Sequence, residues 1–264
     1  MEFGCEQVVI VRSQESKKTV PAFLKYALVL TIYECKGLEF NDVIVCNFFA
    51  ESTANWSLLH YLTTRSGRIE LDEKKKFSEK NVMYSELCSD LKLLYTAVTR
   101  AKRSLIIYDS DEERRNEISR LWKRLDLVAS ERDFVAESIF AKKSSAEEWI
   151  RQGHRMLSKQ LYEQALDCFS KAGDTEMATV CQAYLEADRA VELMKTINKN
   201  KIAAGTKASN KKLLLSKKAI KEMKVDSSRT FITAGQKFAS ANRLKEAARC
   251  FFSAKDYSGA LALF

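Results

Sequence analysis

Residues 93–102, LLYTAVTRAK, end an amphipathic helical pattern and lead directly into the apolar run Ser104–Tyr108 (SLIIY). The helical pattern begins near Tyr84, and the residues that share its apolar face are Leu87, Leu91, Leu94, Tyr95 and Val98. The spacing therefore predicts a helix over Tyr84–Thr99 that is followed at once by a short apolar strand.

Three further apolar runs have the length of strands: Gln7–Arg12 (QVVIVR), Ala27–Tyr33 (ALVLTIY) and Asp42–Phe48 (DVIVCNF). All are nearly continuous in hydrophobicity, which is typical of parallel strands covered on both faces. Another helix is expected near Glu112–Leu127, and the polar stretch Glu51–Lys80 is expected to be an excursion of weaker order. The first half, residues 1–128, is therefore predicted to be an α/β domain built on a parallel sheet.

The second half, residues 129–264, is helical in pattern and contains an internal repeat. Gly153–Asp174 aligns without gaps on Gly235–Asp256, and the identical pairs include Gly153/Gly235, Ala165/Ala247, Cys168/Cys250, Phe169/Phe251 and Ala172/Ala254. Each copy predicts a helical hairpin, and this pattern resembles the tetratricopeptide class. Met177–Ile197 is expected to be helical, and Asn198–Lys212 is expected to be a lysine-rich flexible connection.

The composition favours a helix-rich protein inside the cell. The chain of 264 residues has one proline and eight glycines, too few for a protein built of many tight turns. The seven cysteines form no C-x-x-C pair and only two histidines occur, so no metal site is indicated. The longest apolar run, Tyr26–Tyr33, is too short to span a bilayer. We therefore expect an intracellular protein of the nucleus or cytoplasm with free thiols and no membrane partner.

The formal net charge of +9 is unevenly distributed. Between Lys195 and Lys224, ten lysines occur with a single acidic residue, Glu222. Such a stretch attracts polyanions through counterion release. The alternative explanation is a solvated loop followed by a helix with a lysine-covered face.

Two segments of the first half carry a family resemblance. Thr31–Phe40 reads TIYECKGLEF and Leu93–Lys102 reads LLYTAVTRAK. They resemble motifs V and VI of UvrD/Rep-type superfamily-one helicases, whose patterns run approximately T-x-H-x-x-K-G-L-E-F and L-x-Y-V-A-x-T-R-A. The resemblance covers about residues 5–128 and implies the second RecA-like lobe of such a motor, in partial form. Together with the repeats, the chain resembles the large animal proteins that carry TPR and ankyrin repeats and a helicase-like region.

The resemblance implies an ATP contact at three residues. Arg100 would be the arginine finger that reaches ATP and Mg²⁺ held by another lobe, because positive charge is needed where the transferring phosphoryl group develops its charge. Glu39 would accept a hydrogen bond from the ribose. Gly37 would permit close approach of the backbone to the phosphate or ligand.

The resemblance also implies contact with single-stranded DNA or RNA through Thr31, Tyr33 and Lys36. Tyr33 stands where the family pattern usually has histidine. The substitution removes a ring nitrogen and keeps an aromatic surface on which a base can stack. We expect Cys35 and Cys88 to be packing thiols, and we expect a structural role for Arg12. His60 and His154 are expected to be surface or capping residues.

The parts of the motor that grip phosphate and magnesium do not occur in this sequence. It contains no G-x-x-x-x-G-K-[ST] loop and no strand that ends in Asp-Glu. In the resembling family these parts belong to the first lobe, so we expect a fragment of a longer helicase-like protein that is inactive alone. The alternative is a catalytically vestigial motor that serves as a scaffold and binds a protein partner through its helical repeats.

Overall fold

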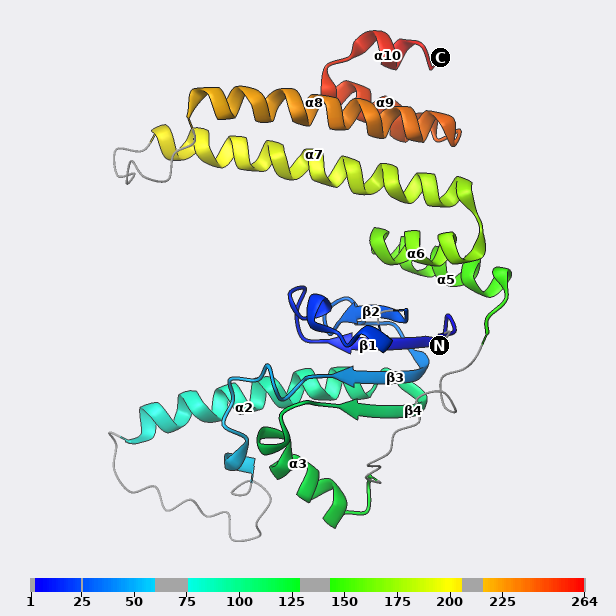
Figure 1. Cartoon of the computed structure of the whole chain (residues 1–264). Helices are drawn as coiled ribbons and strands as arrows, with labels where there is room; N and C mark the ends of the chain where they lie inside the picture. The colour runs from blue at the N-terminus through cyan, green and yellow to red at the C-terminus, as the bar shows by residue number, and fades with distance from the viewer. Residues whose placement is uncertain (1–2, 25, 60–75, 129–142, 206–215, 264) are drawn as a thin grey trace. The chain divides into compact units, whose positions relative to one another are not determined.

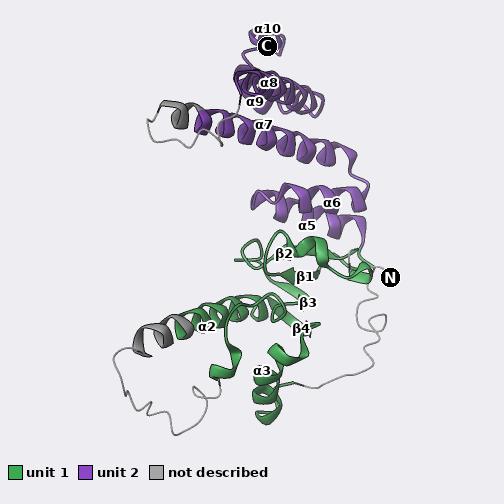
Figure 2. Ribbon diagram, turned by 60° about the vertical axis from the view of Figure 1, so that its left-hand side comes forward, with its two compact units in different colours: residues 1–144 green, residues 145–264 purple. Residues whose placement is uncertain are grey.

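The computed structural model describes residues 3–24, 26–59, 76–128, 143–205 and 216–263. The chain divides into two compact units, residues 1–144 and 145–264, which are coloured separately in Figure 2. The division lies beyond the expected boundary at residue 128, and residues 129–142 between the two positions lie outside the described residues.

Unit 1 is built on a four-stranded sheet whose strands are all parallel. Its strands are β1 (Gln7–Val11), β2 (Leu28–Thr31), β3 (Phe40–Cys46) and β4 (Ala101–Tyr108). The order across the sheet is β2-β1-β3-β4 (Figure 1). The predicted parallel α/β architecture is confirmed, and each predicted apolar run contributes a strand.

In the described residues of this sheet unit, the α-helices are α2 (Lys76–Val98) and α3 (Glu112–Arg124). Helix α2 begins earlier than predicted, so residues 76–80 of the expected excursion are helical, whereas residues 60–75 lie outside the described part. Helix α3 begins at Asp111, whose side chain accepts a hydrogen bond from the Arg114 backbone N–H at 3.0 Å. Three short 3₁₀ turns complete the unit: η1 (Ser16–Thr19), η2 (Ala22–Leu24) and η3 (Trp56–Leu58).

The apolar core lies on both sides of the central strands. On one face, Val9, Val11 and Ile44 pack with Val20 and Leu24 of the segment between β1 and β2. Alternate residues of β1 and β3 point to the other face and are also buried: Val8, Ile10, Val43 and Val45. On α2 the buried apolar residues are Leu87, Leu94 and Ala97.

Two details of the predicted burial are wrong. Tyr95, expected on the apolar face of α2, is 69% exposed, and Ala97 is buried instead. Strand β4 is not covered on both faces, since Leu105 is 41% exposed. This strand lies at the edge of the sheet, where fewer elements pack against it, and the same position explains why its first half carries polar residues.

Unit 2 is all-helical. Its helices are α5 (Ala146–Ser158), α6 (Tyr162–Ala172), α7 (Thr175–Gly205), α8 (Lys217–Ser240), α9 (Leu244–Ala254) and α10 (Tyr257–Leu261). The two copies of the sequence repeat form the hairpins α5–α6 and α8–α9, as predicted. Helix α7 extends to Gly205, so the prediction of a flexible connection is wrong for residues 198–205. This segment contains lysine and alanine, which are good helix formers. Residues 206–212 of that connection lie outside the described part.

Each hairpin of unit 2 is closed by a contact between a glycine and a phenylalanine. A Cβ atom added at Gly153 would lie 2.7 Å from the ring of Phe169, and one added at Gly235 would lie 3.1 Å from the ring of Phe251. The repeat therefore conserves a site at which the first helix has no side chain, so that the aromatic ring of the second helix fits against its backbone.

Two properties of the whole described chain bear on its environment. Six cysteines are buried, whereas Cys88 is exposed, so the packing role expected for Cys88 is wrong. None of the described helices is long and apolar enough to cross a membrane.

Candidate nucleotide and nucleic-acid site

The loop that carries the first motif begins with a reciprocal pair of hydrogen bonds. The Glu34 side chain accepts from the Thr31 backbone N–H at 2.7 Å, and the Thr31 hydroxyl accepts from the Glu34 backbone N–H at 3.2 Å. This is the geometry of a capping box, formed here where strand β2 ends and a helical turn begins. Thr31 is 4% exposed, so its hydroxyl shapes the loop from inside.

Glu34 is further held by two side chains from the segment after β1. Its carboxylate accepts hydrogen bonds from Lys17 Nζ at 2.9 Å and Gln14 Nε2 at 2.7 Å. Burial opposes ionisation of this carboxyl group, but these donors and the Thr31 N–H outweigh it and lower the pKa of Glu34. Glu34 is therefore ionised, and its carboxylate holds the start of the loop in place.

The rest of the loop alternates between buried residues and exposed residues. Cys35 and Leu38 are buried, and burial raises the pKa of the Cys35 thiol to about 11. The loop residues that sequence analysis selected for ligand contact are exposed, namely Tyr33, Lys36, Gly37 and Glu39. Gly37 has a φ of +76°, a backbone conformation in which a residue without Cβ is favoured.

Arg100 lies at the end of α2 and binds to this loop. Its Nη1 donates to the Leu38 carbonyl oxygen at 3.0 Å, its Nε to the Thr96 carbonyl at 2.9 Å, and its Nη2 to the Thr99 hydroxyl at 2.9 Å. A guanidinium has five N–H donors. These bonds use three of them, and one N–H on each terminal nitrogen remains. The half-buried side chain is therefore held firmly and still has donors for a ligand.

Two more contacts join the motif segments. The Phe40 backbone N–H donates to the Arg100 carbonyl at 2.9 Å. Next to this bond, Lys102 Nζ of β4 lies 3.5 Å from a carboxylate oxygen of Glu39, the residue before β3. Glu39, Arg100 and Lys102 therefore lie together at the amino ends of β3 and β4.

The loop also connects opposite ends of the sheet. Thr31 pairs with Val11 at the carboxyl end of β1, whereas Phe40 pairs with Ala101 at the amino end of β4. Because all strands are parallel, the loop runs back along the length of the sheet between these positions. The structure brings Glu39 together with Arg100 and leaves Thr31 at the other end.

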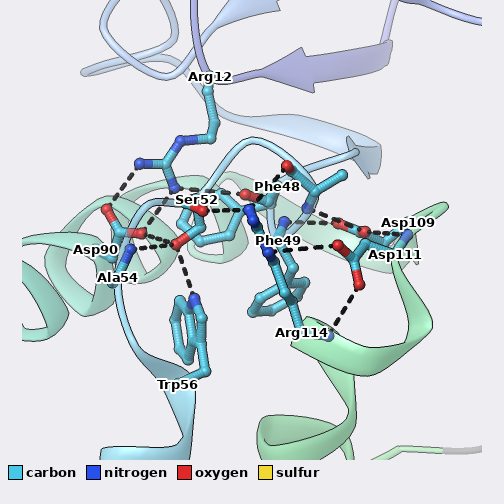
Figure 3. A network of polar contacts seen from close by, with 11 residues as sticks. Arg12, Phe48, Phe49, Ser52, Ala54, Trp56, Asp90, Asp109, Asp111 and Arg114 are labelled. Atoms are coloured by element: carbon cyan, nitrogen blue, oxygen red, sulfur yellow. Dashed lines mark hydrogen bonds and ion pairs between the residues drawn. The ribbon is translucent and has the colours of Figure 1, made fainter.

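A second polar network, which sequence analysis did not find, occupies the carboxyl ends of the strands (Figure 3). Arg12 donates two hydrogen bonds to the carboxylate of Asp90 on α2, at 3.0 and 2.7 Å, and its guanidinium lies 4.6 Å from the centre of the Phe48 ring. The Ser52 hydroxyl also donates to Asp90 and accepts from Trp56 Nε1 at 2.8 Å. Arg12 therefore has the structural role that was expected for it.

Asp109 holds the neighbouring loop in the same network (Figure 3). Its carboxylate accepts from the backbone N–H groups of Phe49 at 2.6 Å and Ala50 at 3.2 Å. Burial raises the pKa of Asp109 although these N–H groups favour the ionised form. The network ties the ends of β1, β3 and β4 to α2, and so places the helix that ends two residues before Arg100.

The comparison with protein families agrees with this geometry. Residues 10–112 match the family described as the UvrD-like helicase C-terminal domain. The chain contains a UvrD-like helicase C-terminal domain. The match includes both motif segments and all the contacts of Arg100 described above, and it supports a helicase-type motor lobe.

A curated relative connects the UvrD-like domain to repeat proteins. The chain is 35% identical over 205 residues to the human protein TPR and ankyrin repeat-containing protein 1. That alignment covers 70% of this chain and 7% of the relative, so the chain spans a small part of the relative's length. A search of the solved structures found no match.

Some of the contacts in the site could have been predicted from the sequence and others could not. The pattern Thr31-x-x-Glu34 is a capping-box signature and could have predicted the turn at the start of the loop. The partner of Arg100 in the loop is a backbone carbonyl, which no residue type reveals. In the described ranges, no group of three histidine, cysteine or acidic side chains is arranged to hold a metal ion.

Proposed function

We propose that this chain supplies the second motor lobe of an ATP-dependent nucleic-acid helicase or translocase, joined to a helical-repeat module that binds a protein partner. The observation that carries the proposal is the bond between Arg100 and the Leu38 carbonyl, because it joins both motif segments in one rigid site. The protein would act inside the cell, in the nucleus or cytoplasm.

On the nucleotide side, Arg100 is the arginine finger. Its two remaining N–H donors would bind the γ-phosphate of ATP presented by another lobe. Glu39 is exposed and its carboxylate can accept a hydrogen bond from a ribose hydroxyl, while Gly37 lets the backbone come close to the ligand. The donor set fits phosphate and ribose, and magnesium would be held by the lobe that carries the phosphate loop.

On the nucleic-acid side, Tyr33 and Lys36 make the contacts. Tyr33 is 72% exposed and offers a ring for stacking on a base, and the exposed Lys36 offers a charge for phosphate. Thr31 contributes through the capping box, which sets the conformation from which Tyr33 projects.

The test uses the full-length protein that contains both lobes. Arg100→Ala is expected to lower kcat for ATP hydrolysis stimulated by single strands by about a thousandfold or more. Arg120→Ala is the matched control, because Arg120 is a 69% exposed arginine of the same unit paired with Glu117. Unchanged hydrolysis in Arg100→Ala would refute the proposal, provided that thermal unfolding shows both variants folded.

The chain alone is expected to be inactive, because one lobe cannot hold magnesium and ATP. Measurement of ATP hydrolysis by residues 1–264, with and without single strands, checks this expectation. Robust turnover by the isolated chain would overturn it.

A second candidate function is a vestigial motor that serves as a scaffold through its helical repeats. It is favoured by the three bonds that hold the Arg100 guanidinium within its own lobe and by tyrosine at position 33. The two candidates differ at the first lobe. A phosphate loop without its lysine there, together with no ATP binding by the full-length protein, would establish the scaffold.

A further inference from the structure

A group of exposed lysines lies at one end of the long helix pair in unit 2. Helices α7 and α8 pack side by side and run in opposite directions, so the end of α7 and the start of α8 lie together (Figure 1). The exposed lysines at this end are Lys195 and Lys199 on α7 and Lys217, Lys218, Lys221 and Lys224 on α8.

Most of these lysines have no acidic partner. Lys195 lies 2.7 Å from Glu192, and Lys218 lies 4.0 Å from Glu222. Within the described ranges, no carboxylate lies within ion-pair distance of the other four, Lys199, Lys217, Lys221 and Lys224, although Lys199 is near enough to contribute to the lowered pKa of Glu192. We call these four residues the lysine face.

The position of the lysine face on α8 is electrostatically unfavourable for the helix. Lys217 and Lys218 occupy the first turn of α8, which contains no acidic residue, whereas α3, α5 and α9 each have a glutamate there. The N-terminus of a helix carries a partial positive charge, so cations there reduce stability. The stability of the free helix therefore does not explain why lysines occupy this turn. A bound anion would remove the repulsion.

The spacing of the α8 lysines suits an extended polyanion. Lys217, Lys221 and Lys224 stand at positions i, i+4 and i+7 and therefore share one side of the helix. They extend over about 10 Å at about 1.5 Å per residue. A linear array of charges with this reach can contact several consecutive phosphates of a nucleic-acid strand.

The buried side of α8 argues against insertion into a membrane. Its aromatic residues, Phe231 and Phe238, are buried in unit 2. The first turns of the helix, residues 217–226, contain no aromatic side chain to enter a lipid interface. The lysine face thus offers charge without an aromatic anchor, and the exposed apolar side chain beside it on α8 is the small Val225, an arrangement suited to phosphates in water.

We propose that the lysine face binds the phosphate backbone of single-stranded nucleic acid at a site outside the motor lobe. The choice of nucleic acid over other polyanions rests on the proposed function, since the UvrD-like domain on the same chain would act on such a strand. Binding is independent of base sequence and strongly dependent on salt, because phosphate contacts carry no sequence information.

The test measures binding of a short fluorescent oligonucleotide to residues 1–264 at several salt concentrations. Replacing three lysines with glutamine (K217Q/K221Q/K224Q) keeps the helix propensity and removes three charges. The slope of log K against log salt is expected to become shallower by about 2, since each phosphate contact to a single strand contributes about 0.7. Affinity at low salt is expected to fall at least about tenfold.

The matched control removes the same charge from other exposed lysines of unit 2. K159Q/K245Q/K255Q is expected to keep the wild-type slope, because these lysines are scattered over α5, α9 and their ends. Circular dichroism checks that both triple variants keep their helix content. Equal salt slopes for the two triple variants would overturn the proposal. The proposal would also be overturned if the lysine-face variant lost binding to anionic lipid vesicles but bound the oligonucleotide as the wild type does.

A third variant separates this site from the motor lobe. If Lys36→Ala abolishes oligonucleotide binding and the lysine-face variant does not change it, the lysine face is excluded and the proposed nucleic-acid contact of the motor stands. If the lysine-face variant alone loses binding, the lysine face is supported and the contact proposed for Lys36 fails.

Discussion

The two units position their elements by different means. In unit 1, buried carboxylates join elements that are far apart in sequence: Asp90 binds Arg12, Asp109 binds the loop after β3, and Asp42 accepts from Arg103 Nη2 at 2.6 Å. In unit 2, the two repeat hairpins depend on contacts of glycine with phenylalanine rings, and a less buried ion pair, Lys237 with Glu186 at 2.6 Å, joins α8 to α7. The comparison teaches that buried carboxylates determine the geometry of unit 1, whereas the fit of a ring against a glycine determines the packing within each repeat hairpin of unit 2.

The comparison predicts its largest effect at Asp90. Asp90→Ala leaves the half-buried Arg12 guanidinium without its carboxylate and is expected to destabilise unit 1 by about 3–5 kcal/mol. Amide hydrogen exchange, analysed by peptides of each unit, is expected to increase in α2 and the segment after β3 and to stay unchanged in unit 2.

The control for Asp90 is Glu86→Ala, which removes an exposed carboxylate from the same helix. It is expected to change stability by less than about 0.5 kcal/mol. If the two substitutions had equal effects, the charge network would not be what holds α2.

A smaller effect is expected at the glycines of unit 2, and it differs between the copies. Gly153→Ala places a Cβ 2.7 Å from the Phe169 ring and is expected to destabilise unit 2 by about 1–2 kcal/mol after the gain in helix propensity. Gly235→Ala, with 3.1 Å to Phe251, is expected to be nearly neutral. Thermal unfolding and peptide-resolved hydrogen exchange measure both.

The glycine contact can be separated from a backbone effect by a second substitution. Phe169→Leu in the Gly153→Ala background is expected to recover part of the lost stability, because a smaller side chain makes room for the Cβ. If Gly153→Ala were neutral, or the second substitution only added to the loss, packing of the ring would not explain the glycine.

The smallest effect, and one that depends on pH, is expected at Glu34. Its folded-state pKa is lowered, so its contribution is present at neutral pH and is lost as the pH falls through the folded pKa. Glu34→Gln is expected to destabilise unit 1 by about 1 kcal/mol at pH 7 and to match the wild type in acid. Stability measured as a function of pH checks this, with Glu86→Gln as the exposed control. A difference that grew in acid would contradict the assignment.

The sequence predicted the elements better than their ends. The apolar runs of β1 and β3 and the repeated Gly, Ala and Phe positions specify burial, and burial determines both the sheet and the hairpins. The polar first half of β4, with Lys102 and Arg103, was missed because an edge strand tolerates such residues. The helical residues 198–205 were missed because a lysine-rich composition is compatible with helix as well as with a linker.

The sequence predicted the parts of the candidate site that consist of side chains within the two motifs. Arg100 and Glu39 were selected from motif patterns, and the structure brings them to the same ends of β3 and β4. The Leu38 carbonyl and the pair of Arg12 with Asp90 could not be predicted, because the first is a backbone group and the second joins residues 78 positions apart.

The distribution of thiols has a practical consequence. Cys88 on α2 is exposed while the other six cysteines are buried, and burial raises the pKa of Cys35 and Cys250 to about 11 and that of Cys46 to about 12. At neutral pH, a maleimide dye will therefore label the natural chain at a single position. Helix α2, which ends two residues before Arg100, can thus carry a fluorophore without any engineered substitution, and the emission of the dye can be followed when nucleotide or oligonucleotide is added.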